Sequence, residues 1–296
     1  MALEAFKPID IGDADLFRSF LRQDPPRISE LTFTNLFMWR ERYRPVWRRW
    51  RDCLLIILQS EEGGVFGLQP VGTGDKASAI GVLLDELVRL GAHARVCRVD
   101  ETFVKAHVDP DRYIATADLD NSDYVYRASD LTALSGRRYH RKKNLVNRFR
   151  RENVFRYRPL DLELVECFLE MQENWCAMRS CLEEPDLKSE DYAIHQVLTH
   201  FEELRFEGGA IEIDGRLEAF SLGEPLNRDT AVIHIEKANP EITGLYAAIN
   251  QQFCEHAWGA MAYVNREQDL GIEGLKKAKS SYNPHHIVNK YTVAHR

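Results

Sequence analysis

A polar loop near the C-terminus carries side chains that could hold a substrate and move a proton. Residues 265–271 supply amide, guanidinium and carboxylate groups directly after an expected strand over residues 261–264. The carboxyl end of a strand in an α/β layer is a usual place for a binding site, and a carboxylate can act there as a general base. The alternative is an ordinary polar loop, followed by a helix whose lysines are only solvated.

Two basic clusters could bind anions. Residues 137–151 contain no acidic side chain, and residues 40–51 contain only Glu41 among their arginines and tryptophans. The chain has 39 Lys+Arg against 46 Asp+Glu, a net charge of -7, and an acidic protein that concentrates positive charge locally usually binds an anion with it. Phosphate is preferred because it matches the planar fork of arginine. The alternatives are solvated helix faces and, for the tryptophans, core packing.

Several other chemistries are excluded by missing motifs. No GxxxxGK[ST], complete GxGxxG, GxSxG or HExxH occurs, so we expect no P-loop, no nucleophile elbow and no metal site. Residues 72–76 read as a turn before a helix. No apolar run approaches the ~20 residues of a membrane span, and no signal peptide is visible. Six scattered cysteines without a CxxC pair are typical of free buried thiols in a reducing cytosol.

Hydrophobic periodicity predicts an α+β protein whose two halves share one order of elements. In the first half, residues 54–59 and 65–69 form a hairpin, residues 76–90 a helix and residues 95–99 a strand. In the second, residues 210–214, 216–224 and 230–236 form strands, Thr243 caps a helix over 244–256, and a strand, a helix over 272–281 and a last strand over 287–293 follow. Two further helices, over 162–178 and 189–204, open this half.

The 296 residues are long enough for two domains. We place the join near residues 109–123, which contain Pro110 and several acidic side chains. The expected domains are residues 1–115 and residues 116–296.

Two segments resemble patterns of one family, the C-terminal region of phosphatidylglycerol lysyltransferase. Gly136 through Asn144, with Phe149, resembles GRKxHxKRNxxxxF, and Asn265 through Tyr282, with Pro284, resembles NREEDLGxxGLRKAKxSYxP. The second pattern is long enough to be specific, and the resemblance covers most of the chain. One departure is Lys276, which stands where the pattern has arginine.

The resemblance implies two tandem GNAT-like (acyltransferase) domains, each a mixed, mostly antiparallel sheet flanked by helices, as in Fem-type transferases. It also implies an aminoacyltransferase that moves an aminoacyl group from aminoacyl-tRNA to an amine or hydroxyl acceptor, either a lipid or a small molecule. Full-length lysyltransferases carry membrane helices before this region, which we do not expect in this chain, and this departure argues against a lipid acceptor. The transfer requires no cofactor, and peripheral membrane contact is compatible with it.

With this resemblance, each group of residues receives an expected role. Asp269 is the first choice for the catalytic carboxylate and Glu267 the second; the alternative for Asp269 is a helix cap near Gly271. Asn265 and Arg266 would orient the substrate, and Lys276, Lys279 and Tyr282 would assist. The residues expected to hold phosphates of tRNA are Arg137, Arg138, His140, Arg141, Lys142, Lys143 and Asn144.

Two other functions are compatible with the sequence. An N-acyltransferase using acyl-CoA is one, although residues 238–244 are a poor pyrophosphate cradle and only the helix start at Gly244 offers N–H groups. A non-catalytic module that binds nucleic acid or another polyanion is the other. For all of these we expect a bacterial, cytoplasmic protein.

Overall fold

The computed structural model describes residues 6–60, 64–179 and 183–296, and divides the chain into two compact units. Unit 1 comprises Met1–Asp123, Gln268–Gly271 and Ile287–Arg296, and unit 2 comprises Tyr124–Glu267 and Ile272–His286. The expected domain boundary at 115/116 lies inside one long strand, β7 (Tyr113–Arg127). The C-terminal strand, which we assigned to the second domain, belongs to unit 1.

Unit 1 is built on a mostly antiparallel sheet that contains one parallel pair of strands. Strands β1 (Lys7–Pro8), β2 (Val46–Trp50), β3 (Cys53–Gln59) and β4 (Val65–Leu68) are successive antiparallel neighbours, with β5 (Val71–Gly72) also on β3. Beyond them, β6 (Arg95–Asp100) pairs in parallel with β4 and antiparallel with β13 (His286–His295). The helices of this unit are α1 (Ala14–Gln23), α2 (Phe33–Met38), α3 (Arg40–Tyr43), α4 (Lys76–Arg89) and α5 (Glu101–His107), with a 3-10 turn at Ile11–Asp13.

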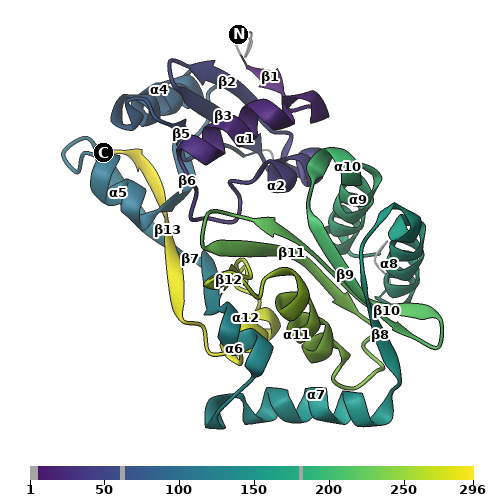
Figure 1. Cartoon of the computed structure of the whole chain (residues 1–296). Coiled ribbons are helices and arrows are strands. Elements are labelled where there is room, and N and C mark those ends of the chain that lie inside the picture. The colour runs from purple at the N-terminus through teal and green to yellow at the C-terminus, as the bar shows by residue number, and fades with distance from the viewer. Residues whose placement is uncertain (1–5, 61–63, 180–182) are drawn as a thin grey trace. The chain divides into compact units, whose positions relative to one another are not determined.

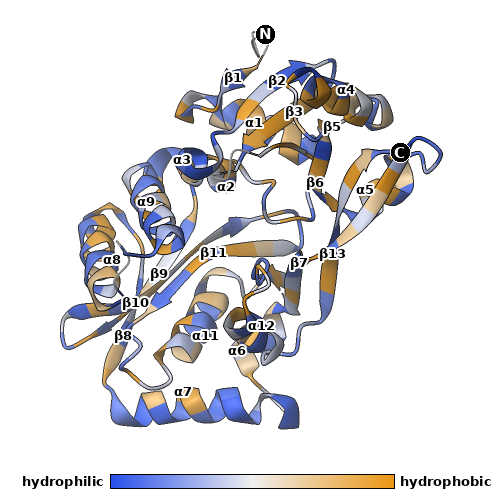
Figure 2. Cartoon of the chain, turned by 180° about the vertical axis from the view of Figure 1, so that it is seen from behind, coloured by the Kyte–Doolittle hydropathy of each residue, from blue (hydrophilic) through white to orange (hydrophobic). Residues whose placement is uncertain are grey.

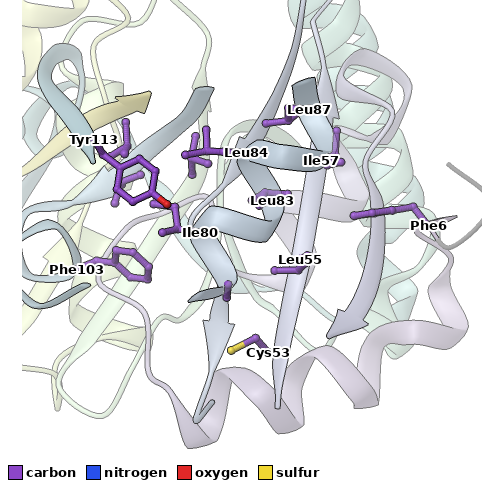
Figure 3. Packing of buried hydrophobic residues seen from close by; sticks show 14 residues of the cluster. Phe6, Cys53, Leu55, Ile57, Ile80, Leu83, Leu84, Leu87, Phe103 and Tyr113 are labelled. Atoms are coloured by element: carbon purple, nitrogen blue, oxygen red, sulfur yellow. The ribbon is translucent and has the colours of Figure 1, made fainter. Parts of the chain in front are cut away.

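Helix α4 supplies the core of unit 1. Its residues Ile80, Leu83, Leu84 and Leu87 recur at helical spacing and are fully buried. They face β3, which is almost wholly apolar (Figure 2), and Figure 3 shows the two elements packed against each other. Burial of one such side chain stabilises the fold by roughly 1.5–3 kcal/mol, which explains why β4, α4 and β6 form one crossover unit.

Unit 2 has the same plan. Strands β8 (Phe155–Pro159), β9 (Glu207–Ile213), β10 (Arg216–Pro225) and β11 (Thr230–Ala238) are antiparallel, β12 (Tyr263–Asn265) is parallel to β11, and the carboxyl end of β7 pairs antiparallel with β12. The helices are α6 (Ala128–Ala133), α7 (His140–Glu152), α8 (Val165–Arg179), α9 (Pro185–Thr199), α10 (Phe201–Leu204), α11 (Leu245–Ala257) and α12 (Glu273–Ser280), with 3-10 turns at Arg137–Tyr139 and Leu162–Leu164.

The two faces of the unit 2 sheet carry different helices. Neighbouring residues of a strand point to opposite faces. On β11, Glu236 accepts a hydrogen bond from Asn250 of α11, whereas Lys237 pairs with Glu190 of α9 and lies over the ring of Trp175 in α8. Helix α11 therefore covers one face and α8 and α9 cover the other (Figure 1).

The fold class predicted from the sequence is confirmed, and two finer expectations are wrong. The chain first passes from unit 1 to unit 2 at Asp123/Tyr124, at the end of the stretch 109–123 where we placed the join, and most of that stretch lies in β7. Gly244, not Thr243, precedes α11, without a side-chain cap. Finally, Cys176 is disulfide-bonded and Cys167 is exposed, so the cysteines are not uniformly free and buried, and Cys181 lies outside the described residues.

Candidate functional site

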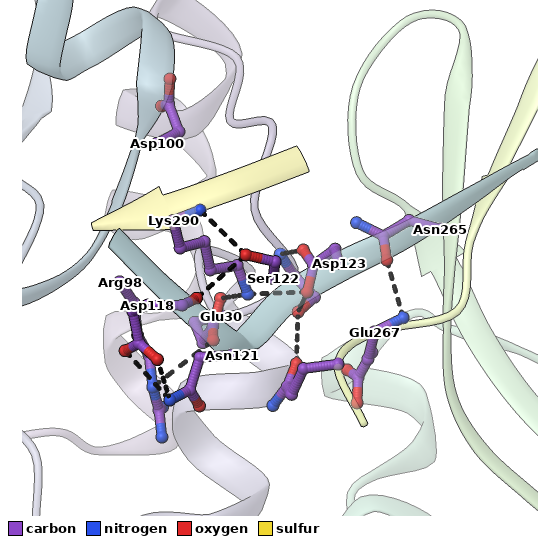
Figure 4. Close-up of polar contacts among 12 residues, drawn as sticks. Glu30, Arg98, Asp100, Asp118, Asn121, Ser122, Asp123, Asn265, Glu267 and Lys290 are labelled. Carbon is purple, nitrogen blue, oxygen red and sulfur yellow. Dashed lines mark hydrogen bonds and ion pairs between the residues drawn. The ribbon is translucent and has the colours of Figure 1, made fainter. Parts of the chain in front are cut away.

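The predicted loop begins where β12 ends in the interior of unit 2. Asn265 is fully buried, and its Oδ1 accepts a hydrogen bond of 2.7 Å from the backbone N–H of Glu267 (Figure 4). The neighbouring strand holds the loop as well: Tyr124 donates its N–H to the carbonyl of Glu267 and accepts one from Arg266. Glu267 has a positive φ of 58°. A non-glycine residue held in this strained region is a feature that clusters at functional sites.

Arg266 lies in a cluster of charged, amide and aromatic side chains on the sheet face that α11 covers. Its guanidinium pairs with Glu236 at 2.9 Å and lies 4.6 Å from the centre of the Tyr282 ring. Asn250 donates a second hydrogen bond to Glu236 at 2.8 Å. Burial opposes the charged form of Arg266, but Glu236 more than compensates, and the pKa of Arg266 is raised.

Lys142 also lies close to the ring of Tyr282. Its Nζ lies 4.0 Å from the centre of the Tyr282 ring. Burial, together with the positive charge of Arg266, lowers the pKa of Lys142 to about 8. No carboxylate of the described residues forms an ion pair with Lys142. The two motifs singled out in the sequence thus meet at Tyr282, and the cations around it outnumber the carboxylates, as expected for an anion-binding site.

Glu267 is held by a buried histidine that the sequence did not reveal. His234 has a side chain only 3% exposed, and its two ring nitrogens lie 2.8 Å from Glu267 and 3.0 Å from Glu224. Burial alone would lower the pKa of His234, but the two hydrogen bonds and charges of the carboxylates raise it to about 9. The imidazole is therefore protonated at neutral pH and fixes the carboxylate of Glu267.

The remaining residues of the second motif have more local partners. Lys279 donates to the carbonyl of Arg266, and the hydroxyl of Tyr126 donates to the carbonyl of Lys279 at 2.8 Å, so α12 holds the loop in place. Lys276 is exposed. Asp269 belongs to unit 1, where it is buried and its Oδ1 accepts the N–H of Gly271 at 2.9 Å. This bond closes a turn, and no side chain caps α12.

The first motif forms a basic surface on α7 and the 3-10 turn before it. Arg138 is neutralised by Asp130 at 2.8 Å, and Asn144 lies near His140. Arg137, Arg141 and Lys143 are exposed, and none of them pairs with a carboxylate in the described part of the chain. The charge on this surface is therefore available to a ligand, as the anion-binding interpretation requires.

The other basic cluster is occupied by contacts within unit 1. Trp47 is buried and donates to Asp13, while Arg48 pairs with Glu86 and Arg49 with Asp52. These contacts favour the core-packing interpretation of residues 40–51 over stacking on nucleic acid.

The start of α11 does not present an open phosphate cradle. Gly244 has a φ of 86°, and a Cβ placed on it would lie 2.4 Å from the carbonyl oxygen of Leu145 in α7. The backbone of α7 therefore passes directly against the helix start that we considered for acyl-CoA.

Four site residues escaped the sequence reasoning: His234, Glu224, Glu236 and Asn250. A signal for two of them exists, because His234 and Glu236 are polar residues at alternate positions of a mostly apolar strand and so share one face. No group of three or more potential metal ligands occurs among residues 6–60, 64–179 and 183–296. Within the same ranges, no helix is both long and apolar enough to cross a membrane.

Comparisons with known proteins agree with this architecture. The chain matches the family described as phosphatidylglycerol lysyltransferase, C-terminal, over residues 22–294. A conserved protein of unknown function from Bacteroides thetaiotaomicron is 32% identical, with a TM-score of 0.91 and coverage of 98% of this chain and 99% of that one.

Two more distant structures share the fold. L-PGS from Bacillus licheniformis is 14% identical, with a TM-score of 0.67 over 95% of this chain and 91% of that one. FemX is 8% identical, with a TM-score of 0.61 over 97% of this chain and 96% of that one. No curated protein matches the chain.

Proposed function

Since the chain belongs to the family of the phosphatidylglycerol lysyltransferase C-terminal region, we propose that it is an aminoacyltransferase. Group transfer is the class of activity for which the family is named. The finer proposal is that an aminoacyl group moves from aminoacyl-tRNA to an amine or hydroxyl of a lipid or small molecule. The observation that carries it is the meeting of Lys142, Arg266 and Tyr282 from two separate motifs in one partly buried cationic site.

The reaction requires no covalent intermediate between the protein and the aminoacyl group. For an amine acceptor, the nitrogen attacks the ester carbon, a C–N bond forms, and the C–O bond to the ribose of the tRNA breaks. The nitrogen loses one proton and the ribose oxygen gains one, so the overall transfer needs no oxidant or cofactor. Positioning of the two substrates and stabilisation of the oxyanion are the main requirements.

The cationic site can supply the electrostatic part. Arg266 is already neutralised by Glu236, whereas Lys142 keeps a positive charge without a carboxylate partner among the described residues. Lys142 is therefore the group we propose to bind a phosphate of the donor or the developing oxyanion. The exposed Arg137, Arg141 and Lys143 extend the same positive surface along α7 and would hold the tRNA backbone.

Glu267 is the carboxylate that we propose acts on the acceptor. His234 fixes one of its oxygens, Asn265 fixes its backbone, and its φ is strained. A carboxylate held in this way can bind the ammonium of an acceptor and receive its proton. Asp269 remains the alternative, although its bond to Gly271 favours a role in shaping the turn.

The test separates donors and includes a matched lysine control. Purified protein is incubated with a pool of radiolabelled aminoacyl-tRNAs and, separately, with labelled acetyl-CoA, in an extract that supplies acceptors. We expect label to move from tRNA, and Lys142→Gln to reduce the rate about 10²-fold, as loss of one oxyanion donor does. Lys188→Gln, an exposed lysine of α9, should leave the rate unchanged.

Other outcomes would contradict the proposal. Label moving from acetyl-CoA would establish the acyl-CoA enzyme instead. Binding of tRNA with a steep salt dependence but without any product would identify a binding module. Equal rates for Lys142→Gln and Lys188→Gln would remove Lys142 from the reaction.

A further inference from the structure

Unit 1 contains a small cavity that the transfer reaction does not use. The cavity has a volume of about 130 Å³ and lies between the segment from Asp24 to Leu31, the residues that follow β4, and helix α5. A single water needs about 10–15 Å³ on such a measure, and sites for drug-sized ligands hold about 300–1,000 Å³. The cavity is therefore sized for a ligand of several non-hydrogen atoms.

Two buried polar side chains that line this cavity each have one polar atom without a hydrogen-bond partner among the described residues. Gln69 is 6% exposed; its Oε1 accepts the N–H of Asp100, and no described residue bonds its Nε2. Asp100 is 5% exposed; its Oδ1 accepts the N–H groups of Thr102 and Phe103 at the start of α5, and no described residue bonds its Oδ2. Both residues are more than nine-tenths buried, yet neither free atom is fully enclosed, so this donor and this acceptor can each bond a polar ligand in the cavity.

The charges around the cavity specify what that ligand carries. Asp24 and Lys76 neutralise each other at 2.6 Å, and the second oxygen of Asp24 accepts the N–H of Gly72. Arg27 donates to the hydroxyl of Thr102, but no carboxylate of the described residues pairs with it. Arg27 is exposed and its charge also acts on Glu101, but it forms no ion pair among the described residues, and neither does Asp100, so one cation and one anion can take part in binding a ligand.

We propose that this cavity binds a small zwitterion of amino-acid size. Its ammonium group lies against Oδ2 of Asp100, and its carboxylate accepts hydrogen bonds from Arg27 and from Nε2 of Gln69. Phe103 and Leu31 provide the apolar part of the wall, and His107, whose pKa is lowered by burial and by the charge of Lys76, also lines the cavity.

The experiment is calorimetric titration of the full chain with glycine, alanine and serine, without tRNA or CoA. Each amino acid is compared with its N-acetyl form, which lacks the ammonium, and its carboxamide, which lacks the carboxylate. We expect the free amino acids to bind, and either blocked form to bind about tenfold more weakly, since each has lost a charge-assisted hydrogen bond.

Two substitutions assign the two charges. Arg27→Gln should weaken binding of the zwitterion about tenfold and leave binding of the carboxamide unchanged. Asp100→Asn retains an Oδ1 that can cap α5, and should weaken the zwitterion while leaving the N-acetyl form unchanged. Arg22→Gln, an exposed arginine of α1, is the control, and thermal unfolding confirms that each variant is folded.

Three results would overturn the proposal: no binding of any free amino acid, equal binding of free and blocked forms, or equal affinities in Arg27→Gln and Arg22→Gln. The outcome is independent of aminoacyl transfer. A chain that transfers nothing can still bind the zwitterion here, and an active transferase can fail to.

Discussion

His234 carries a charge that its own surroundings create. Its imidazole lies between Glu224 and Glu267, and its pKa is about 9 in the folded chain against an ordinary value of 6.5. A group whose pKa is raised on folding stabilises the native state below the unfolded pKa, and this stabilisation disappears as the pH rises through the folded pKa. The relevant window is therefore pH 6.5 to 9.

We predict that His234→Gln removes most of this pH dependence. Between pH 6 and pH 9, the wild-type chain should lose about 3 kcal/mol of its free energy of unfolding through this one group. Urea unfolding at both pH values measures the loss. Lys142 titrates near the upper end of the window, but it is present in both proteins, so the difference between them isolates His234. Parallel pH profiles for the two proteins would refute the assignment.

Some residues of the candidate site could be predicted from the sequence, and others could not. Arg266, Lys279 and Tyr282 stand in one continuous motif, so it could be predicted that they lie close together in the structure. His234 and Glu236 lie in a strand remote from that motif, and only the register of β11 against β12 brings them to the loop. Such strand pairings depend on packing between distant parts of the chain, and the spacing of residues within one segment does not predict them.

At the scale of elements, the close approach of α7 and α11 depends on one glycine. Gly244 combines a φ of 86° with a position at which a Cβ would lie 2.4 Å from the carbonyl of Leu145. Any other residue would have to strain its backbone and displace α7, the helix that carries Lys142. The packing of these two helices therefore links the fold to the proposed donor site.

We predict that Gly244→Ala destabilises the chain by about 2 kcal/mol or more, because backbone strain and steric overlap add. The control is Gly274→Ala in the exposed helix α12, where a Cβ would meet nothing within 4 Å. Alanine there should stabilise by about 0.5–1 kcal/mol, since it favours helix over glycine. Thermal unfolding of both variants gives the comparison, and two shifts of the same sign would contradict the argument.

Helices and strands could be predicted where apolar residues recur with a regular spacing. The expected strand over 216–224 and helix over 272–281 correspond closely to β10 and α12. Strand β7 was missed because its middle is acidic and partly exposed, which resembles a linker. Strand β7 forms because it pairs with other strands. In this segment the tertiary structure outweighs the low strand propensity of the acidic residues.

At the scale of the whole molecule, unit 1 is assembled from distant parts of the chain. Lys290 of β13 is fully buried, and its Nζ lies 2.6 Å from both Glu30 and Asp123 (Figure 4). Ser29 donates two further hydrogen bonds to Asp123. Burial would lower the pKa of Lys290, but the two carboxylates more than compensate and raise it. The N-terminal region, β7 and the last strand thus share one buried charge cluster.

We predict that Lys290→Met destabilises the chain by about 3–5 kcal/mol, because two buried carboxylates lose their central cation. Replacing Glu30 by Gln and Asp123 by Asn in the same chain should recover part of this loss, since the uncompensated charges are then gone. Lys277→Met, which removes an exposed ion pair of α12 with Glu273, should change the free energy of unfolding by at most about 0.5 kcal/mol. Denaturant unfolding decides: if Lys290→Met is no more destabilising than Lys277→Met, the buried cluster does not hold the three segments together, and the apolar core around α4 alone must unite them.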